Sequence, residues 1–136
     1  MSDDSTDTDR PDRLAQGRKT RSEVLGPAHV ARSDANRTPE DARFIELITE
    51  AAWGHVWSSE AISRRERSML TIALLAALGN EEELRLHLRA TANTGASRSD
   101  VIEALHHVAI YAGVPRANSA IRIAKEIWAE EPQAKD

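Results

Sequence analysis

The chain has 136 residues, 40% of them hydrophobic, and a formal net charge of −4 at pH 7. This length suits a single domain, and no apolar run approaches the roughly 18 residues that a membrane-spanning helix requires. Because the sequence contains no cysteine, disulfides, thiolate zinc sites and thiol-based mechanisms are excluded. The mild negative charge gives no indication of nucleic-acid or membrane binding, and it leaves room for a local basic pocket that receives an anionic substrate.

The N-terminal segment, residues 1–20, is polar and rich in Asp, Ser, Thr and Arg. Such a segment buries too little apolar surface to offset the entropy lost on ordering. We therefore expect a flexible acidic arm, followed by one domain over residues 21–136. The first residues lack the basic start and apolar stretch of a signal peptide, which favours a cytoplasmic protein. Residues 21–37 mix short apolar patches with Gly26 and Pro27, and they predict a short helix or an irregular lead-in.

Helix boundaries become clear in the sequence from Thr38 onward. Thr38 followed by Pro39 is typical of a helix start, and apolar residues recur at helical spacing in the segment that follows. Ser63 with Glu66 has the sequence pattern of a capping box. The helix after it is apolar on nearly all sides over residues 69–78, which predicts a central, buried position in the fold.

Three more helices are expected in the C-terminal half of the chain. Asn80 with Glu83 repeats the capping pattern for a helix that ends near Gly95. Ser97 caps the next helix, and Pro115 opens the last one. No segment alternates apolar and polar residues for long enough to predict a strand. The predicted fold class is therefore all-α, a compact bundle of about five or six helices.

The helix after Asn80 carries the first candidate site. Leu84 and Leu88 mark its inward stripe, and His87 lies within that stripe. Glu83 lies one turn before His87, where a carboxylate favours the imidazolium and orients the ring. Both residues also have a purely structural interpretation: Glu83 can complete the Asn80 cap, and His87 can be a hydrogen-bonded core residue. Spacing alone does not decide between these interpretations.

Further candidates lie on the two neighbouring helices. Arg67, near the start of the preceding helix, is either a binding residue or a solvated surface charge. His107 and Tyr111 lie one turn apart on the helix after Ser97, with His106 adjacent. Neighbouring histidines point in different directions and cannot easily share an ion, so no metal site is predicted. Glycine-rich phosphate-binding and dinucleotide-binding patterns are missing.

Four segments carry a combined pattern: AWGHVW at residues 52–57, RRERSMLTIA at 64–73, NEEELRLHLRA at 80–90 and AIYAGVPRAN at 109–118. Together they resemble the carboxymuconolactone decarboxylase family, part of the alkylhydroperoxidase-D-like superfamily. The resemblance implies an all-helical subunit in a ring-like homo-oligomer, with a hexamer expected. Thiol peroxidases of the superfamily use a C-x-x-C pair, and Asn80 and Glu83 stand at those positions here. Peroxidase activity is therefore excluded.

The resemblance further implies decarboxylation of 4-carboxymuconolactone to 3-oxoadipate enol-lactone and CO2, in the protocatechuate branch of the β-ketoadipate pathway. The departing carboxylate is gamma to the lactone carbonyl across a double bond, so the substrate accepts its own electrons and no cofactor is expected. We expect His87, oriented by Glu83, to supply a proton or stabilise the dienolate. Arg67 is the expected carboxylate ligand, and His107 with Tyr111 is expected to line the pocket.

Two other functions are compatible with the sequence. The first is a different enzyme on the same scaffold, such as a lactone hydrolase or another decarboxylase. The second is a non-catalytic helical oligomer that binds a small acid or a partner protein. Turnover of the lactone distinguishes both from the main expectation.

Overall fold

The computed structural model describes residues 12–131 of the chain. Within this range all regular secondary structure is helical, with seven α-helices and one π-helical segment, η1. The predicted all-α fold class is confirmed, although the helices outnumber the five or six expected. The chain separates into two compact units, an N-terminal unit up to Ala61 and a C-terminal unit from Ile62 onward. None of the described helices is long and apolar enough to cross a membrane.

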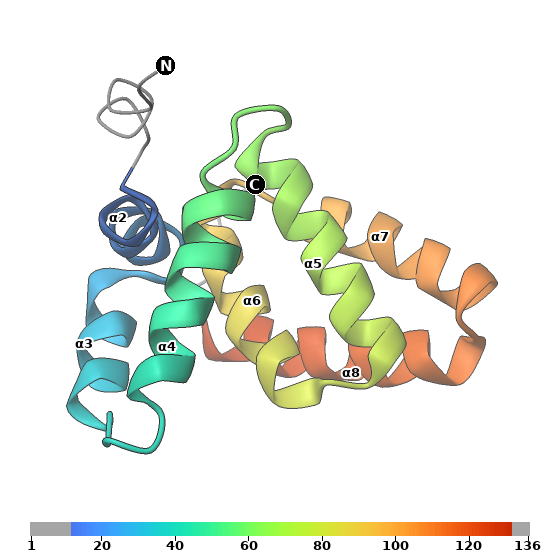
Figure 1. Ribbon diagram of the computed structural model, residues 1–136. Coiled ribbons are helices and arrows are strands. Elements are labelled where there is room, and N and C mark those ends of the chain that lie inside the picture. The colour runs from blue at the N-terminus through green and yellow to red at the C-terminus, as the bar shows by residue number, and fades with distance from the viewer. Residues whose placement is uncertain (1–11, 132–136) are drawn as a thin grey trace. The chain divides into compact units, whose positions relative to one another are not determined.

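The N-terminal unit contains α2 (Arg13–Leu25), α3 (Pro27–Ala35), α4 (Ala42–Ile48) and η1 (Thr49–Trp57). The chain passes from α4 into η1 without a break, and α2 packs along η1 (Figure 1). Trp53 and Trp57 are each 6% exposed, and their ring centroids lie 5.3 Å apart. The pair supplies the largest apolar side chains buried in this unit.

Two glycines allow α2 and η1 to approach closely. A Cβ atom on Gly17 would overlap the backbone carbonyl of Thr49, and a Cβ atom on Gly54 would overlap that of Arg13. Arg13 also donates a hydrogen bond from Nη1 to the Gly54 carbonyl at 3.2 Å. Glycine at these positions therefore sets the distance between the two helices.

The start of α2 differs from the sequence-based expectation. Residues 13–20 are helical, whereas composition predicts an arm over residues 1–20. The side chain of Asp12 accepts a hydrogen bond from the Ala15 N–H and caps the helix. Packing against η1 then supplies burial that composition does not reveal. The remainder of the predicted arm, residues 1–11, lies outside the described residues.

The predicted helix start at Thr38 and Pro39 is wrong. The helix begins at Ala42, with Asp41 at the N-cap position. The backbone N–H of Thr38 donates to Oδ1 of Asp41 at 3.0 Å, which closes a turn before the helix. A local side-chain bond thus competes with helix initiation at Pro39.

The C-terminal unit contains α5 (Arg64–Leu78), α6 (Glu81–Thr94), α7 (Arg98–Tyr111) and α8 (Val114–Glu130). Helix α8 packs against the other three, and Figure 1 shows it crossing beneath them. Apolar side chains from all four helices form one core. Its least exposed large members are Ile72, Leu84, Leu88, Val101, Leu105, Ile123 and Ile127.

Two of the three predicted caps in this unit are confirmed. Ser63 with Glu66 and Ser97 with Asp100 each form a reciprocal capping box. Asn80 occupies the N-cap of α6 but makes no side-chain cap bond, so that prediction is wrong. Three glutamates in the first turn of α6 instead place negative charge near the positive end of the helix dipole.

Helix α5 is not buried on all sides, contrary to the sequence-based expectation. Only Ser68, Ile72 and Ala76 are buried. The side chains on another face are 56–67% exposed: Leu70, Leu74 and Leu78. The apolar character of this helix therefore exceeds what the C-terminal unit covers.

Candidate functional site

Helix α6 holds the predicted His87 inside the C-terminal unit. His87 is 7% exposed and lies between two core residues, Leu84 and Leu88, which are 2% and 0% exposed. Placement on the inward stripe follows from the helical spacing of these three residues. The sequence therefore placed the imidazole on the correct side of the helix.

Glu83 lies one turn before His87 in the first turn of α6, and its side chain is exposed. Among the described residues, no ion pair or hydrogen bond of the Glu83 carboxylate is present. The structure thus places the two residues one turn apart on the same helix. The side chain of Glu83 is in solvent, whereas that of His87 is buried.

Arg67 lies in the first turn of α5 and is partly buried. Helices α5 and α6 are joined by a tight turn at Gly79, whose φ of 74° is the left-handed conformation that glycine adopts readily. The two helices pack against each other, so Arg67 and His87 belong to adjacent helices of one hairpin.

His107 and Tyr111 are brought together on α7. Their rings stack with centroids 6.0 Å apart and an interplanar angle of 17°. Tyr111 is 83% exposed and His107 is also exposed. The predicted one-turn spacing is therefore realised as a contact between two aromatic rings at the surface.

A cavity of about 460 Å³ opens between α5 and α7 in the C-terminal unit. Its lining includes His107 and Ala104 from α7 and Glu66, Met69 and Leu70 from α5. The other predicted site residues are not part of this lining. The lining is mainly apolar, with Glu66 and His107 as its ionisable side chains.

Glu66 also lines this cavity, although the sequence indicates only a capping role for it. Its pattern indicates a capping box, and the Ser63 backbone N–H does donate to Glu66 Oε1 at 2.8 Å. That bond lowers the pKa of Glu66, so the carboxylate stays ionised beside the cavity. The helical spacing of Glu66, Met69, Leu70 and Ala73 is the signal that these residues share one face.

An ion pair joins the first turns of α5 and α7. Arg65 donates from Nε and Nη2 to the two carboxylate oxygens of Asp100, both at 2.7 Å. The Arg65 guanidinium, followed by the Ser97 backbone N–H, holds the pKa of Asp100 well below its usual range. The bidentate geometry fixes the spacing of the two helix starts.

The described residues contain no group of three His, Asp or Glu side chains arranged to hold a metal ion. His106 and Glu103 pair at 3.3 Å, but both are exposed and lie on α7 alone. No candidate metal ligands are therefore identified within residues 12–131.

Comparison with known proteins adds to this geometry. The model of the carboxymuconolactone decarboxylase family matches residues 42–126, which run from the start of α4 into α8. This match covers more than half of the chain and includes every predicted site residue. The chain belongs to the carboxymuconolactone decarboxylase family. The resemblance predicted from the four sequence segments is confirmed.

Individual relatives agree with the family assignment. The chain is 44% identical over 116 residues to 4-carboxymuconolactone decarboxylase of Acinetobacter baylyi, covering 85% of this chain and 87% of that protein. It is 37% identical over 127 residues to a nitrosuccinic acid decarboxylase of Metarhizium robertsii, covering 93% and 89%. An uncharacterised 15.0 kDa protein of Paracoccus denitrificans is 27% identical over 88 residues, covering 63% and 66%.

Proposed function

We propose that this member of the carboxymuconolactone decarboxylase family converts 4-carboxymuconolactone to 3-oxoadipate enol-lactone and CO2, in the protocatechuate branch of the β-ketoadipate pathway. The observation that carries the proposal is the 44% identity to a 4-carboxymuconolactone decarboxylase over 85% of this chain and 87% of that protein. A second relative is also named as a decarboxylase. Decarboxylation is therefore better supported than lactone hydrolysis.

The chemistry explains what the site has to supply. When the carboxylate leaves, its bonding electrons pass through the ring double bond to the lactone carbonyl oxygen and form a dienolate. Protonation of the alpha carbon then gives the enol-lactone. The protein has to bind the retained carboxymethyl group, stabilise the oxyanion and deliver one proton. An oxyanion donor is typically worth about 10²–10³ in rate, and a positioned acid roughly 10²–10⁴.

We assign the proton donor or oxyanion ligand to His87, with Glu83 as the residue that favours its charged form. Burial of His87 supports this assignment, because a largely dehydrated imidazole interacts more strongly with a developing oxyanion. In this proposal the exposed side chain of Glu83 reaches His87 by moving one turn toward the C-terminal end of α6.

We assign the carboxylate ligand to Arg67, on the helix adjacent to that of His87. A guanidinium binds a carboxylate through two parallel hydrogen bonds, which orients the substrate as well as holding it. His107 and Tyr111 are placed farther out, as part of the pocket wall. The proposal requires no metal or organic cofactor, since the electrons are accepted by the substrate itself.

We further propose that copies of this chain associate, with a hexamer as the expected assembly. The support is the apolar surface of the C-terminal unit, where Leu74, Leu78, Ile110, Tyr111 and Val114 are 62–83% exposed. Several large apolar side chains exposed on one unit are typical of a surface that contacts another protein. Cytoplasmic localisation stays a prediction.

The direct test is release of CO2 from 4-carboxymuconolactone, generated in situ from 3-carboxymuconate by a cycloisomerase. We expect release that depends on the purified protein and persists in the presence of a chelator. Nitrosuccinic acid serves as the competing substrate. Preference for that acid contradicts the lactone assignment, and binding of the lactone without turnover supports a non-catalytic acid-binding protein.

The residue assignment is tested by His87→Ala. We expect turnover of the lactone to fall to background while the elution volume of the oligomer is unchanged, because the variant removes the proton donor and only part of one core contact. His106→Ala is the matched control, since that histidine lies on α7 with an exposed side chain. Full activity of His87→Ala would refute the role of this histidine.

A further inference from the structure

A second cavity, of about 280 Å³, lies in the N-terminal unit, and decarboxylation assigns no role to the residues around it. Its charged lining consists of Arg18 and Arg21 from α2, Asp34 from α3, Arg37 from the following turn, and Glu46 from α4. This volume is just below the roughly 300–1,000 Å³ that is typical of small-molecule sites, so the cavity suits a small ligand. Three guanidinium groups against two carboxylates give its lining a formal charge of +1.

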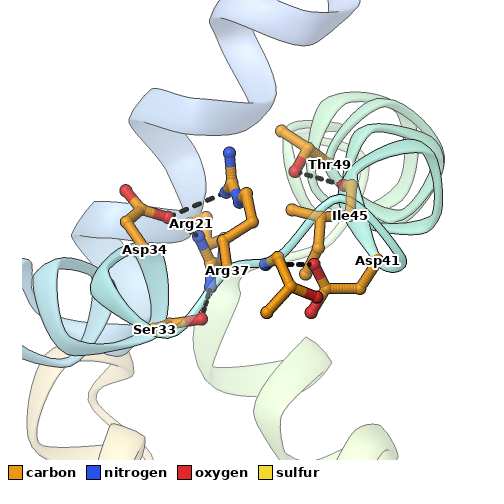
Figure 2. Close-up of polar contacts among 8 residues, drawn as sticks. Arg21, Ser33, Asp34, Arg37, Asp41, Ile45 and Thr49 are labelled. Carbon is orange, nitrogen blue, oxygen red and sulfur yellow. Dashed lines mark hydrogen bonds and ion pairs between the residues drawn. The ribbon is translucent and has the colours of Figure 1, made fainter.

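Two of the guanidinium groups share one carboxylate. Arg37 Nη2 lies 2.8 Å from Asp34 Oδ1, and Arg21 Nη1 lies 3.7 Å from the same oxygen. Arg21 also donates from Nη2 to Ser33 Oγ at 2.9 Å. Figure 2 shows the side chains of Arg21 and Arg37 meeting beside the segment that carries Ser33 and Asp34. One positive charge in this cluster is therefore not balanced by Asp34.

Arg21 is the member of the cluster that most needs a counter-charge. Its side chain is only 13% exposed, while that of Arg37 is 41% exposed. A guanidinium with little access to water is stable only when hydrogen bonds and an opposite charge replace its hydration. The 3.7 Å contact to Asp34 meets only part of this requirement.

Arg18 adds a second guanidinium to the same wall. It lies three residues before Arg21 on α2, so the two side chains share a helix face. Within residues 12–131, the side chain of Arg18 makes no hydrogen bond or ion pair, and neither does the carboxylate of Glu46. Arg18 and Glu46 are thus separate charges on the cavity wall, and they do not neutralise each other by contact.

The large apolar side chains of the lining are Leu14 from α2, Val30 from α3 and Ile45 from α4. We propose that this cavity binds a small monocarboxylate with a single ring, its carboxylate on Arg18 and Arg21 and its ring against these three side chains. Glu46 disfavours a second carboxylate by like-charge repulsion. The ligand class therefore differs from the dicarboxylated lactone, and the inference goes beyond the proposed function.

Titration calorimetry of benzoate into the full-length protein tests the proposal in the absence of any lactone. We expect saturable binding of one benzoate per chain. Benzyl alcohol, which lacks the charge, should bind at least tenfold more weakly, because a hydrogen bond to a charged group is worth about 1.5–3 kcal/mol. Phthalate, which carries a second carboxylate, should also bind more weakly than benzoate. No benzoate binding, or equal binding of benzoate and benzyl alcohol, would overturn the proposal.

Variants locate the binding site. Arg18→Gln should weaken benzoate binding about tenfold or more, since it removes a carboxylate ligand that makes no other side-chain contact among the described residues. Glu46→Gln should reduce the preference for benzoate over phthalate. Arg32→Gln is the matched control, because Arg32 is exposed on α3 and is not part of the cavity lining. An equal effect of Arg18→Gln and Arg32→Gln would show that only net charge matters and would refute the site.

Lactone turnover by the same variants separates this proposal from the decarboxylase assignment. Arg18→Gln is expected to retain wild-type turnover, because Arg18 has no role in the proposed reaction. If Arg18→Gln lost both lactone turnover and benzoate binding, the proposal of a separate site would be overturned. Absence of lactone turnover in the wild type would contradict the proposed function alone, since benzoate binding is measured without the lactone.

Discussion

Arg67 can be tested separately from His87, because the two residues have different tasks in the proposed reaction. Arg67→Gln removes the carboxylate ligand and leaves the proton donor in place. We expect kcat/KM for the lactone to fall roughly 10- to 100-fold, as for loss of a charge-assisted hydrogen bond, with much of the change in KM. Steady-state kinetics measure the effect. Arg43→Gln, an exposed position on α4, is the control for a change in net charge.

The Arg65–Asp100 ion pair predicts a pH dependence of stability. The folded-state pKa of Asp100 lies below its unfolded value of about 3.9, so this carboxylate stabilises the fold above that pH. The contribution is lost as the pH falls through the lower, folded-state pKa. Asp100→Asn should therefore have a lower urea midpoint than the wild type at pH 7, and the difference should narrow at pH 3.

Arg65→Gln provides the companion measurement for that prediction. It leaves the Asp100 carboxylate and the Ser97 cap in place but removes the guanidinium, which is the largest cause of the lowered pKa of Asp100. Its midpoint should approach that of the wild type at low pH in the same way. A difference between Asp100→Asn and the wild type that is constant from pH 7 to pH 3 would contradict the role of the ion pair.

At the scale of elements, the contact between α2 and η1 makes Gly17→Ala informative. Helix propensity predicts that this change raises the stability of the protein, whereas packing predicts that it lowers it. Alanine in a helix interior is normally about 1 kcal/mol more favourable than glycine. Here the added methyl group would overlap the carbonyl of Thr49, and such overpacking typically costs about 1–3 kcal/mol. We expect a lower Tm by thermal denaturation, because the cost of overpacking exceeds the gain in helix propensity.

Ala15→Gly on the same helix isolates the propensity effect for comparison. Ala15 is exposed, so this change should lower stability through the backbone alone. A Tm for Gly17→Ala above that of the wild type would show that α2 and η1 separate without cost, which would contradict the close contact.

The sequence was sufficient for two capping boxes and for the inward face of α6, which depend on neighbours along the chain, although the local patterns at Thr38 and Asn80 were misleading. The Ser63 and Ser97 capping boxes were predictable because each joins residues three apart. His87 was correctly placed on the inward face of α6 by its spacing from Leu84 and Leu88. These are local or periodic properties, and both can be read from one sequence.

Features that depend on packing between distant segments could not be predicted in the same way. The helical start at residues 13–20 requires burial against η1, and the cavity beside His107 requires α5 and α7 to meet. The exposed leucines of α5 are the clearest case. Their spacing correctly indicates an apolar helix, but it does not indicate what covers each face.

At the scale of the whole molecule, the exposed apolar surface predicts association. Leu74→Glu places a charge on the α5 surface where the side chain is 62% exposed, so the fold of one chain should tolerate it while contact between copies should not. Light scattering coupled to size-exclusion chromatography should show a smaller assembly. Ala129→Glu, at an exposed position on α8, is the control. If both variants kept the mass of the wild-type assembly, Leu74 would not be part of the interface.

The distribution of tryptophans gives each unit its own optical signal. Trp53 and Trp57 are buried in the N-terminal unit with their rings tilted by 32° to each other. In the C-terminal unit, the Arg98 guanidinium carbon lies 5.2 Å from the ring centroid of Trp128. Replacing Trp128 with phenylalanine leaves intrinsic emission that comes from the N-terminal unit alone. The converse double replacement leaves emission from the C-terminal unit. Fluorescence during unfolding thereby distinguishes whether the two halves of the chain melt in one step or in sequence.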